Sequence, residues 1–372
     1  MKRVKWIDNA RTIGILLIII GHTVGATFGP TVQNVIFTVN VSIFFFISGY
    51  LHKDKPIKKV IKSGFDNLLL PYLITSVLMI AFSLIAVKWP NRLLNLCFPT
   101  LKQGIIAALY GVGTSVTIIG TKPVNVLSIG AIWFLPCMFI ANITYTLIKR
   151  LMSRCHLKNI GITIIFSIIC GLGFCLTKKF NLFLPWSIPA ACISLLFYWI
   201  GDLAHQYDLF HKKNPVLFVI CIIIWILSAK MGVFWFNTAS ADYPPIAVIG
   251  SLAGCYTICC FSIWIEEKLN GFSKRFIKLG ELSLVVLCTH ILDLNNFRFV
   301  FIIVNKIFAL FQISSLKIYT ICSILYRIVF ALLSIFIVPK IPVLRSFFMY
   351  RQYPLKIINT KKSNKSSIEK NI

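Results

Sequence analysis

The sequence predicts an all-α polytopic membrane protein with about ten transmembrane helices and with both termini in the cytoplasm. Of its 372 residues, 58% are hydrophobic and 13% are charged, and the mean hydropathy is +0.83. Soluble domains are only about 45–50% apolar. Apolar runs long enough to span a bilayer recur along most of the chain. Lys and Arg residues gather in alternate connecting segments, as the positive-inside rule requires.

The predicted spans follow from the lengths of the apolar runs, because a transmembrane helix needs about 20 residues. The ten runs cover residues 12–28, 32–51, 68–88, 128–148, 159–177, 183–201, 215–236, 244–265, 279–294 and 318–338. Gly29 and Pro30 separate the first run from the second, and Pro339 ends the last.

Two further stretches, residues 103–119 and 297–313, are apolar but contain interruptions. The first holds several Gly and Thr residues, and the second carries Asn305 and Lys306 in its middle. With ten spans, 27 of the 38 Lys and Arg residues lie in inner segments and 10 in outer segments. If both stretches crossed, the balance would fall to 22 against 14. We therefore expect both to be re-entrant or interfacial segments on the outer side.

The net charge and the cysteines exclude other classes of protein. A formal charge of +27 can indicate nucleic-acid binding. In an integral membrane protein, however, basic residues collect in cytoplasmic loops, so we expect no nucleic-acid partner. The 12 Cys residues lie mostly inside apolar runs, without a C-x-x-C pair or a Cys/His cluster at zinc spacing. We expect them to be small buried hydrophobic residues, and we expect no metal site.

The chain divides into a membrane domain at 1–340 and a basic tail at 341–372. The last part of the tail is polar and rich in Lys and Ser. Such a segment buries too little apolar surface to fold alone, and it is attracted to anionic membrane lipids. We therefore expect a disordered cytoplasmic tail, and we find no soluble domain in the sequence.

Arg11 and His22 bracket the first apolar run. Eleven helical steps of ~100° bring them to within ~20° of the same face, about 16 Å apart along the axis. Arg11 is then expected at the inner membrane surface and His22 near the middle of the bilayer. A titratable residue at that depth is costly unless it faces protein or water, so His22 is a candidate functional residue, although it could also simply hydrogen-bond between helices.

Two more spans carry basic groups at a similar depth. His290 is eleven residues from the inner end of the ninth run, and Arg327 is eleven from the inner end of the tenth. Each is thus about 16 Å from the cytoplasmic face, like His22. His290 could be purely structural, and Arg327 could be tolerated by pairing with Asp293 or Glu281. Their common depth favours a shared site.

A dense cationic loop, residues 52–66, follows the second run on the inner side. Such a loop can be an ordinary positive-inside signal. However, Lys58, Lys59 and Lys62 recur at helical spacing, so they could also form a phosphate clamp together with Arg11.

Several motifs occur in a fixed order along residues 5–338. They are Arg11 and His22 with Asp8 ahead of them, FFFISGYL at 44–51, LLLPYL at 68–73, WFL at 133–135 and SLVVLCTH at 283–290. Together they resemble the acyltransferase-3 family, and most closely its branch of sugar O-acetylases such as fucose 4-O-acetylase. In one respect the chain departs from that family, which often has an Arg shortly before the LLxP motif. Here Asp66 and Asn67 stand in that place.

The resemblance implies a multi-pass enzyme of the bacterial inner membrane that transfers acetyl groups from acetyl-CoA to hydroxyls of a surface polysaccharide or lipid-linked sugar. Acetyl-CoA is then the acyl donor, and no cofactor is permanently bound. Arg11 with Lys58, Lys59 and Lys62 would hold the CoA phosphates. The family also contains members with a fused extracytoplasmic hydrolase-like domain, which this chain lacks.

The same residues define a hypothesis for the chemistry. His22 would act as a general base or as a nucleophile that forms an acetyl-imidazole, and the sequence leaves both open. Arg327 or a ring N–H of His290 would stabilise the oxyanion. Two other functions fit ten spans with buried His and Arg: a proton-coupled transporter and a non-catalytic component of a polysaccharide assembly complex. The absence of an evident internal repeat and the scarcity of buried carboxylates argue against the transporter.

Overall fold

The computed structural model describes residues 4–25, 27–118, 124–211, 214–312, 314–350 and 353, without the side chains of 270–275. Its helices are α1 (Lys5–Val24), α2 (Pro30–Val39), α3 (Ser42–Tyr50), α4 (Ile57–Gly64), α5 (Leu70–Lys88), α6 (Leu101–Tyr110), α7 (Phe134–Arg154), α8 (Asn159–Lys178), α9 (Ile188–Gln206), α10 (Pro215–Met231), α11 (Pro244–Lys268), α12 (Asn270–Glu281), α13 (Ser283–Asn295), α14 (Phe299–Phe311), α15 (Leu316–Ile337) and α16 (Pro342–Phe348). Two antiparallel hairpins pair β1 (Val116–Ile118) with β2 (Val124–Val126), and β3 (Phe234–Trp235) with β4 (Ser240–Ala241).

The fold confirms an all-α polytopic membrane protein. In the described residues, eight helical segments are long and apolar enough to cross a membrane. They are Lys5–Val24, Pro30–Tyr50, Ile57–Lys88, Gly130–Arg154, Asn159–Lys178, Pro185–Gln206, Pro244–Lys268 and Leu316–Lys340. The seventh and ninth apolar runs form the shorter helices α10 and α13, of 17 and 13 residues. At a rise of 1.5 Å per residue these helices span only about 25 Å and 20 Å.

The ninth run does not begin at residue 279 as predicted, because the chain breaks at Leu282 between α12 and α13. α12 lies against α1, where a Cβ on Gly280 would come 1.9 Å from the carbonyl oxygen of Asp8. The Thr12 hydroxyl also donates to the Phe276 carbonyl at 2.7 Å. These contacts with α1 hold α12, while α13 leaves in its own direction.

The two interrupted stretches form short helices. The first contains α6, of 10 residues, followed by strand β1, and the second contains α14, of 13 residues. Their lengths correspond to about 15 Å and 20 Å, less than the ~30 Å of the hydrocarbon core. The basic tail beyond Tyr353 lies outside the described residues.

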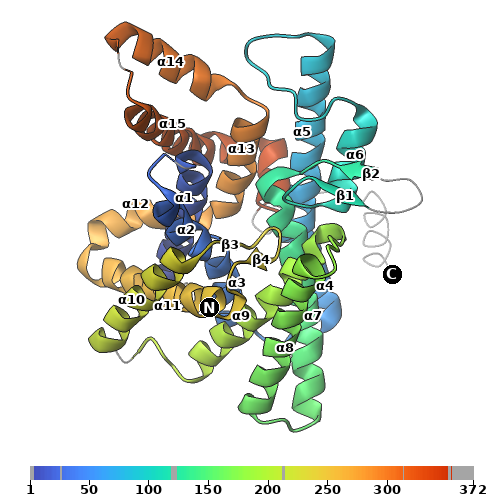
Figure 1. The fold of residues 1–372 in the computed structure, drawn as a ribbon, viewed down its shortest axis with the longest axis vertical. Helices are drawn as coiled ribbons and strands as arrows, with labels where there is room; N and C mark the ends of the chain where they lie inside the picture. The colour runs from blue at the N-terminus through green and yellow to red at the C-terminus, as the bar shows by residue number, and fades with distance from the viewer. Residues whose placement is uncertain are drawn as a thin grey trace, which may run out of the picture.

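Helix α1 packs against α11, α12 and α15, while α7–α9 form a separate group to the lower right of it in Figure 1. Two glycines bring α3 and α9 into backbone contact: a Cβ on Gly49 would meet the Tyr198 carbonyl oxygen at 1.9 Å, and one on Gly201 would meet that of Phe46 at 2.0 Å. Such close packing by small residues is typical of membrane helices. It explains why FFFISGYL carries a glycine.

Candidate active site

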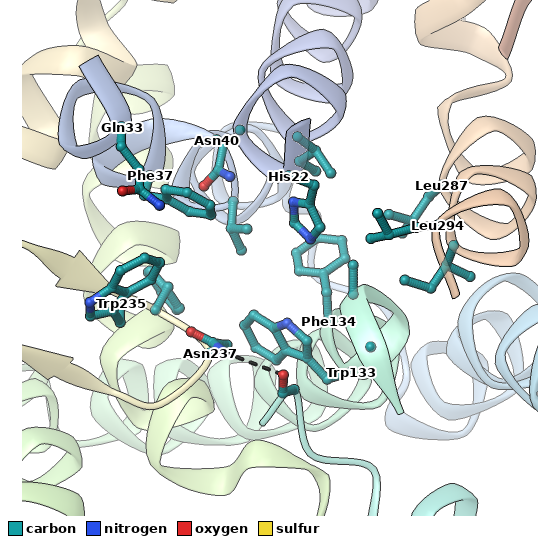
Figure 2. Close-up of a pocket in the computed structure, with 18 of the residues that line it drawn as sticks. His22, Gln33, Phe37, Asn40, Trp133, Phe134, Trp235, Asn237, Leu287 and Leu294 are labelled. Atoms are coloured by element: carbon teal, nitrogen blue, oxygen red, sulfur yellow. Dashed lines mark hydrogen bonds between the residues drawn. The ribbon is translucent and has the colours of Figure 1, made fainter. Parts of the chain in front are cut away.

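His22 lies in the last turn of α1, two residues before the helix ends at Val24. Its depth therefore differs from the predicted middle of the first span, because α1 begins at Lys5 instead of residue 12. The His22 side chain lies on the wall of a cavity of about 380 Å³ (Figure 2). The other walls come from α2, α13, the segment before α7 and the turn between β3 and β4.

The structure brings three of the predicted site residues together. The ring centroids of His22 and His290 are 5.9 Å apart, with 71° between the ring planes. Arg327 donates from Nη1 to the hydroxyl of Thr23, next to His22, at 3.2 Å. His22 from α1, His290 from α13 and Arg327 from α15 therefore form one cluster, as their common depth predicted.

Asp293 holds Arg327 from the other side. Its Oδ2 lies 3.8 Å from Nε of Arg327, and its Oδ1 accepts a hydrogen bond from the Tyr326 hydroxyl at 3.0 Å. Both members of this ion pair are buried. Of the two carboxylates that the sequence offered to Arg327, Asp293 is the one that pairs with it.

Several buried atoms of this cluster make no hydrogen bond to the described part of the chain. They are Nδ1 of His22 and Nε2 of His290, together with Nε of Arg327 and Oδ2 of Asp293, which face each other only as the ion pair at 3.8 Å. A buried polar atom without a partner lowers stability, so such atoms usually bind a ligand or water. Of these four residues, only His22 lines the cavity, and it makes this wall a candidate binding or catalytic site.

Arg11 lies outside this cavity. Its Nη1 is 3.5 Å from Oδ1 of Asp8, three residues earlier on the same helix. Ile15 and Ile18 occupy the stripe of α1 between Arg11 and His22, and they are only 1% and 4% exposed. The cavity lining includes Ile18 but not Arg11. Arg11 and His22 therefore share one face of α1 as predicted, but the side chains of Ile15 and Ile18 fill the space between them.

Lys58, Lys59 and Lys62 are exposed on α4, whose buried residues Val60 and Gly64 face inward. α4 packs against α7, where a Cβ on Gly64 would meet the Phe139 ring at 2.7 Å. α1 packs instead against α11, α12 and α15. The structure therefore does not bring the three lysines next to Arg11 or into the His22 cavity.

The sequence analysis did not single out Asn40, which lies at the break between α2 and α3. Asn40 lines the cavity and is 1% exposed, and neither Nδ2 nor Oδ1 has a hydrogen-bond partner in the described residues. Gln33, Trp235 and Asn237 also line the cavity. A polar residue inside an apolar run is the signal that could have identified Asn40.

A second polar cluster lies where α7, α9 and the segment after α3 meet. Asp202 accepts hydrogen bonds from Lys149 and Tyr145, and from Gln206 at 3.1 Å. The His52 ring stands edge-on to Tyr145, at 4.9 Å between centroids. Burial and the nearby Lys149 ammonium lower the pKa of His52 to about 4, so it is neutral at pH 7. This cluster lies apart from the cavity lining.

No curated protein and no solved structure matches the chain. The family model of the acyltransferase-3 family, an acyltransferase domain, matches residues 4–341. The match covers nearly the whole chain, and it includes His22, His290 and Arg327. This multi-pass membrane protein therefore belongs to the acyltransferase-3 family, and it carries an acyltransferase domain.

Proposed function

We propose that this protein transfers an acetyl group from acetyl-CoA to a hydroxyl of a cell-surface sugar, in the O-antigen, the capsule or a related glycan, at the bacterial inner membrane. The observation that carries the proposal is that His22, which lines a cavity inside an acyltransferase domain, is in ring contact with the buried His290. An imidazole in that position can move a proton or carry an acyl group.

Two routes use His22. As a general base, His22 takes the proton of the sugar hydroxyl while that oxygen attacks the thioester carbonyl, and the CoA thiolate leaves with the proton. As a nucleophile, its ring nitrogen displaces the thiolate first, and the sugar oxygen then takes the acetyl group from the acetyl-imidazole. Both routes form one ester bond, break one thioester bond and return His22 to its starting state.

His290 is the better placed of the two oxyanion donors, because its ring contacts that of His22 and its Nε2 has no partner in the described residues. Arg327 is already engaged with Asp293 and Thr23. We therefore assign the oxyanion to His290, and we assign to Arg327 the positioning of Thr23 beside His22. One such donor in a dry site is worth about 2.7–4 kcal/mol.

The donor is proposed to arrive from the inner end of α1. Arg11, and separately Lys58, Lys59 and Lys62, offer cations to the CoA phosphates at that end. The flexible arm of CoA must then cover the ~16 Å of helix rise between Arg11 and His22. Because Ile15 and Ile18 fill this stripe, their side chains must shift before the thioester reaches His22.

The test compares surface glycans from cells that lack the gene and are complemented with the wild type or with His22→Ala. NMR of the isolated glycan should show ester-linked acetate with the wild type and none with His22→Ala, at equal membrane levels of the two proteins. Wild-type acetylation by a normally inserted His22→Ala variant would refute the assignment. If acetate is absent with both, the substrates proposed here are wrong.

A further inference from the structure

The amide of Asn40 is buried beside His22 without any hydrogen-bond partner in the described residues. Asn34, six residues earlier on the same helical segment, is also buried, but its Nδ2 donates to the Ala229 carbonyl at 3.0 Å. The fold therefore satisfies a buried Asn where it serves packing. The Asn40 side chain lies in the cavity (Figure 2), where its amide can both donate and accept a hydrogen bond.

Aromatic rings form the wall of the cavity next to Asn40 and His22. The Phe37 centroid is 6.1 Å from that of His22 and 4.8 Å from that of Trp235. Trp133 lines the cavity on another side (Figure 2). A sugar ring has an apolar C–H face that packs on aromatic rings and a rim of hydroxyls that bind amides. The wall offers both kinds of group.

The size and charge of the cavity fit a neutral sugar unit. Its volume of about 380 Å³ lies within the ~300–1,000 Å³ range of small-molecule sites and leaves room for one sugar unit. No Lys or Arg occurs among the described residues that line it. The CoA phosphates therefore have no counter-ion here, and the cavity is distinct from the place where the donor's charged end would bind.

The cavity also lies at the end of the molecule where a surface glycan is expected. Its walls include the turn between β3 and β4 and the residues just before α7. Both segments connect helices at the end of the molecule opposite to α4, which carries the three lysines. The distribution of Lys and Arg assigns the α4 end to the inner side. The His22 cavity is then reached from the outer side.

We propose that this cavity is the acceptor site, and that the Asn40 amide and the Trp235 ring select a sugar ring by binding one of its hydroxyls and packing on its apolar face. This inference rests on the proposed acetyl transfer to a sugar. Asn40 holds the hydroxyl within reach of His22. The specificity of the enzyme for its acceptor therefore depends on the side chains of Asn40 and Trp235, and only weakly on the residues that bind acetyl-CoA.

The experiment uses purified full-length protein in nanodiscs, labelled acetyl-CoA, and surface polysaccharide isolated from a strain that lacks the gene. Asn40→Leu and Trp235→Ala should each lower kcat/KM for the polysaccharide by about tenfold, the loss expected for one hydrogen bond or one packed ring. The KM for acetyl-CoA should stay unchanged. Matched controls away from the cavity, Asn159→Leu and Trp264→Ala, should leave both constants at the wild-type value.

Thermal unfolding separates a binding role for Asn40 from a structural one. Because its amide has no partner in the described residues, Asn40→Leu should keep or raise the melting temperature while acceptor kinetics worsen. A lower melting temperature, or an unchanged kcat/KM for the polysaccharide in both cavity variants, would overturn the acceptor site. Those outcomes would leave the proposed acetyl transfer itself intact, provided that His22→Ala is inactive in the same assay.

Discussion

The imidazole rings of His22 and His290 lie 5.9 Å apart, although they come from the first and ninth apolar runs of the sequence. Thr23 and Asp293, the neighbours of this pair on α1 and α13, both contact Arg327 of α15. Of these residues, His22 lines the cavity, His290 contacts the His22 ring, and Arg327 bonds to the neighbouring Thr23; neither His290 nor Arg327 is part of the lining. The predictions below test each part of this arrangement.

Replacing His290 by Phe should keep the ring volume and remove the donor proposed for the oxyanion. We expect kcat for acetyl transfer to fall by about 10²–10³-fold, with KM for acetyl-CoA unchanged, because the oxyanion exists only in the transition state. Steady-state kinetics on purified protein measures both constants. The control is Thr289→Val, since the Thr289 hydroxyl bonds only within its own helix and should be dispensable. A raised KM with normal kcat would assign His290 to donor binding instead.

Breaking the pair between Arg327 and Asp293 should destabilise the fold. Arg327→Met leaves a buried carboxylate unpaired, which costs about 3–5 kcal/mol in the free energy of unfolding. The double variant Arg327→Met/Asp293→Leu should recover most of that loss and remain poorly active, because Thr23 is no longer held. Denaturant unfolding in mixed micelles, together with the transfer assay, measures the two effects. Full activity in the stable double variant would remove Arg327 from the site.

Reversing the charges of Lys58, Lys59 and Lys62 to Glu should raise KM for acetyl-CoA and leave kcat nearly unchanged. The reason is that the lysines are exposed cations proposed to bind only the phosphates. The wild-type KM should also rise with salt concentration, since salt screens such contacts. Lys102→Glu, an exposed charge on α6, is the control and should have the wild-type KM. An unaltered KM in the triple variant would show that the loop is only a topology signal.

Gly49→Ala and Gly201→Ala should each destabilise the protein by at least 1–3 kcal/mol, the usual cost of overpacking. Each new methyl group would collide with a backbone carbonyl of the facing helix, which cannot move aside as a side chain can. Gly171→Ala on α8 is the matched control: its Cβ meets nothing within 4 Å, so helix propensity should make it neutral or stabilising. The melting temperatures of the three variants measure this effect. Equal melting temperatures would contradict the close packing of α3 and α9.

The sequence predicted those features that depend on position along a helix. Hydropathy located the spans, and His22, His290 and Arg327, which residue counting placed at one level, meet in one cluster, although α1 and α13 begin at residues other than those from which the count was made. Residue counting could not show how far each helix is rotated or displaced. It therefore missed the break at Leu282 and the isoleucines that fill the stripe between Arg11 and His22.

The sequence also did not predict the positions of polar residues that are uncharged or that pair with a distant residue. Asn40 interrupts its apolar run with a polar but uncharged group, a weaker signal than the charged or titratable residues that were singled out, and it lines the cavity. Asp202 is 3% exposed within α9 and bonds to Lys149 and Tyr145. The partners of such residues lie far away in sequence, and only the packing of α7 on α9 brings them together.

The most direct test of the account is transfer of labelled acetyl from acetyl-CoA to polysaccharide by the purified protein, without any ion gradient. The wild type should form labelled ester, and His22→Ala should form none while keeping the wild-type melting temperature within a few degrees. Transfer by His22→Ala at the wild-type rate would contradict the role of His22. Wild-type activity that appears only with a proton gradient would indicate a coupled transporter instead.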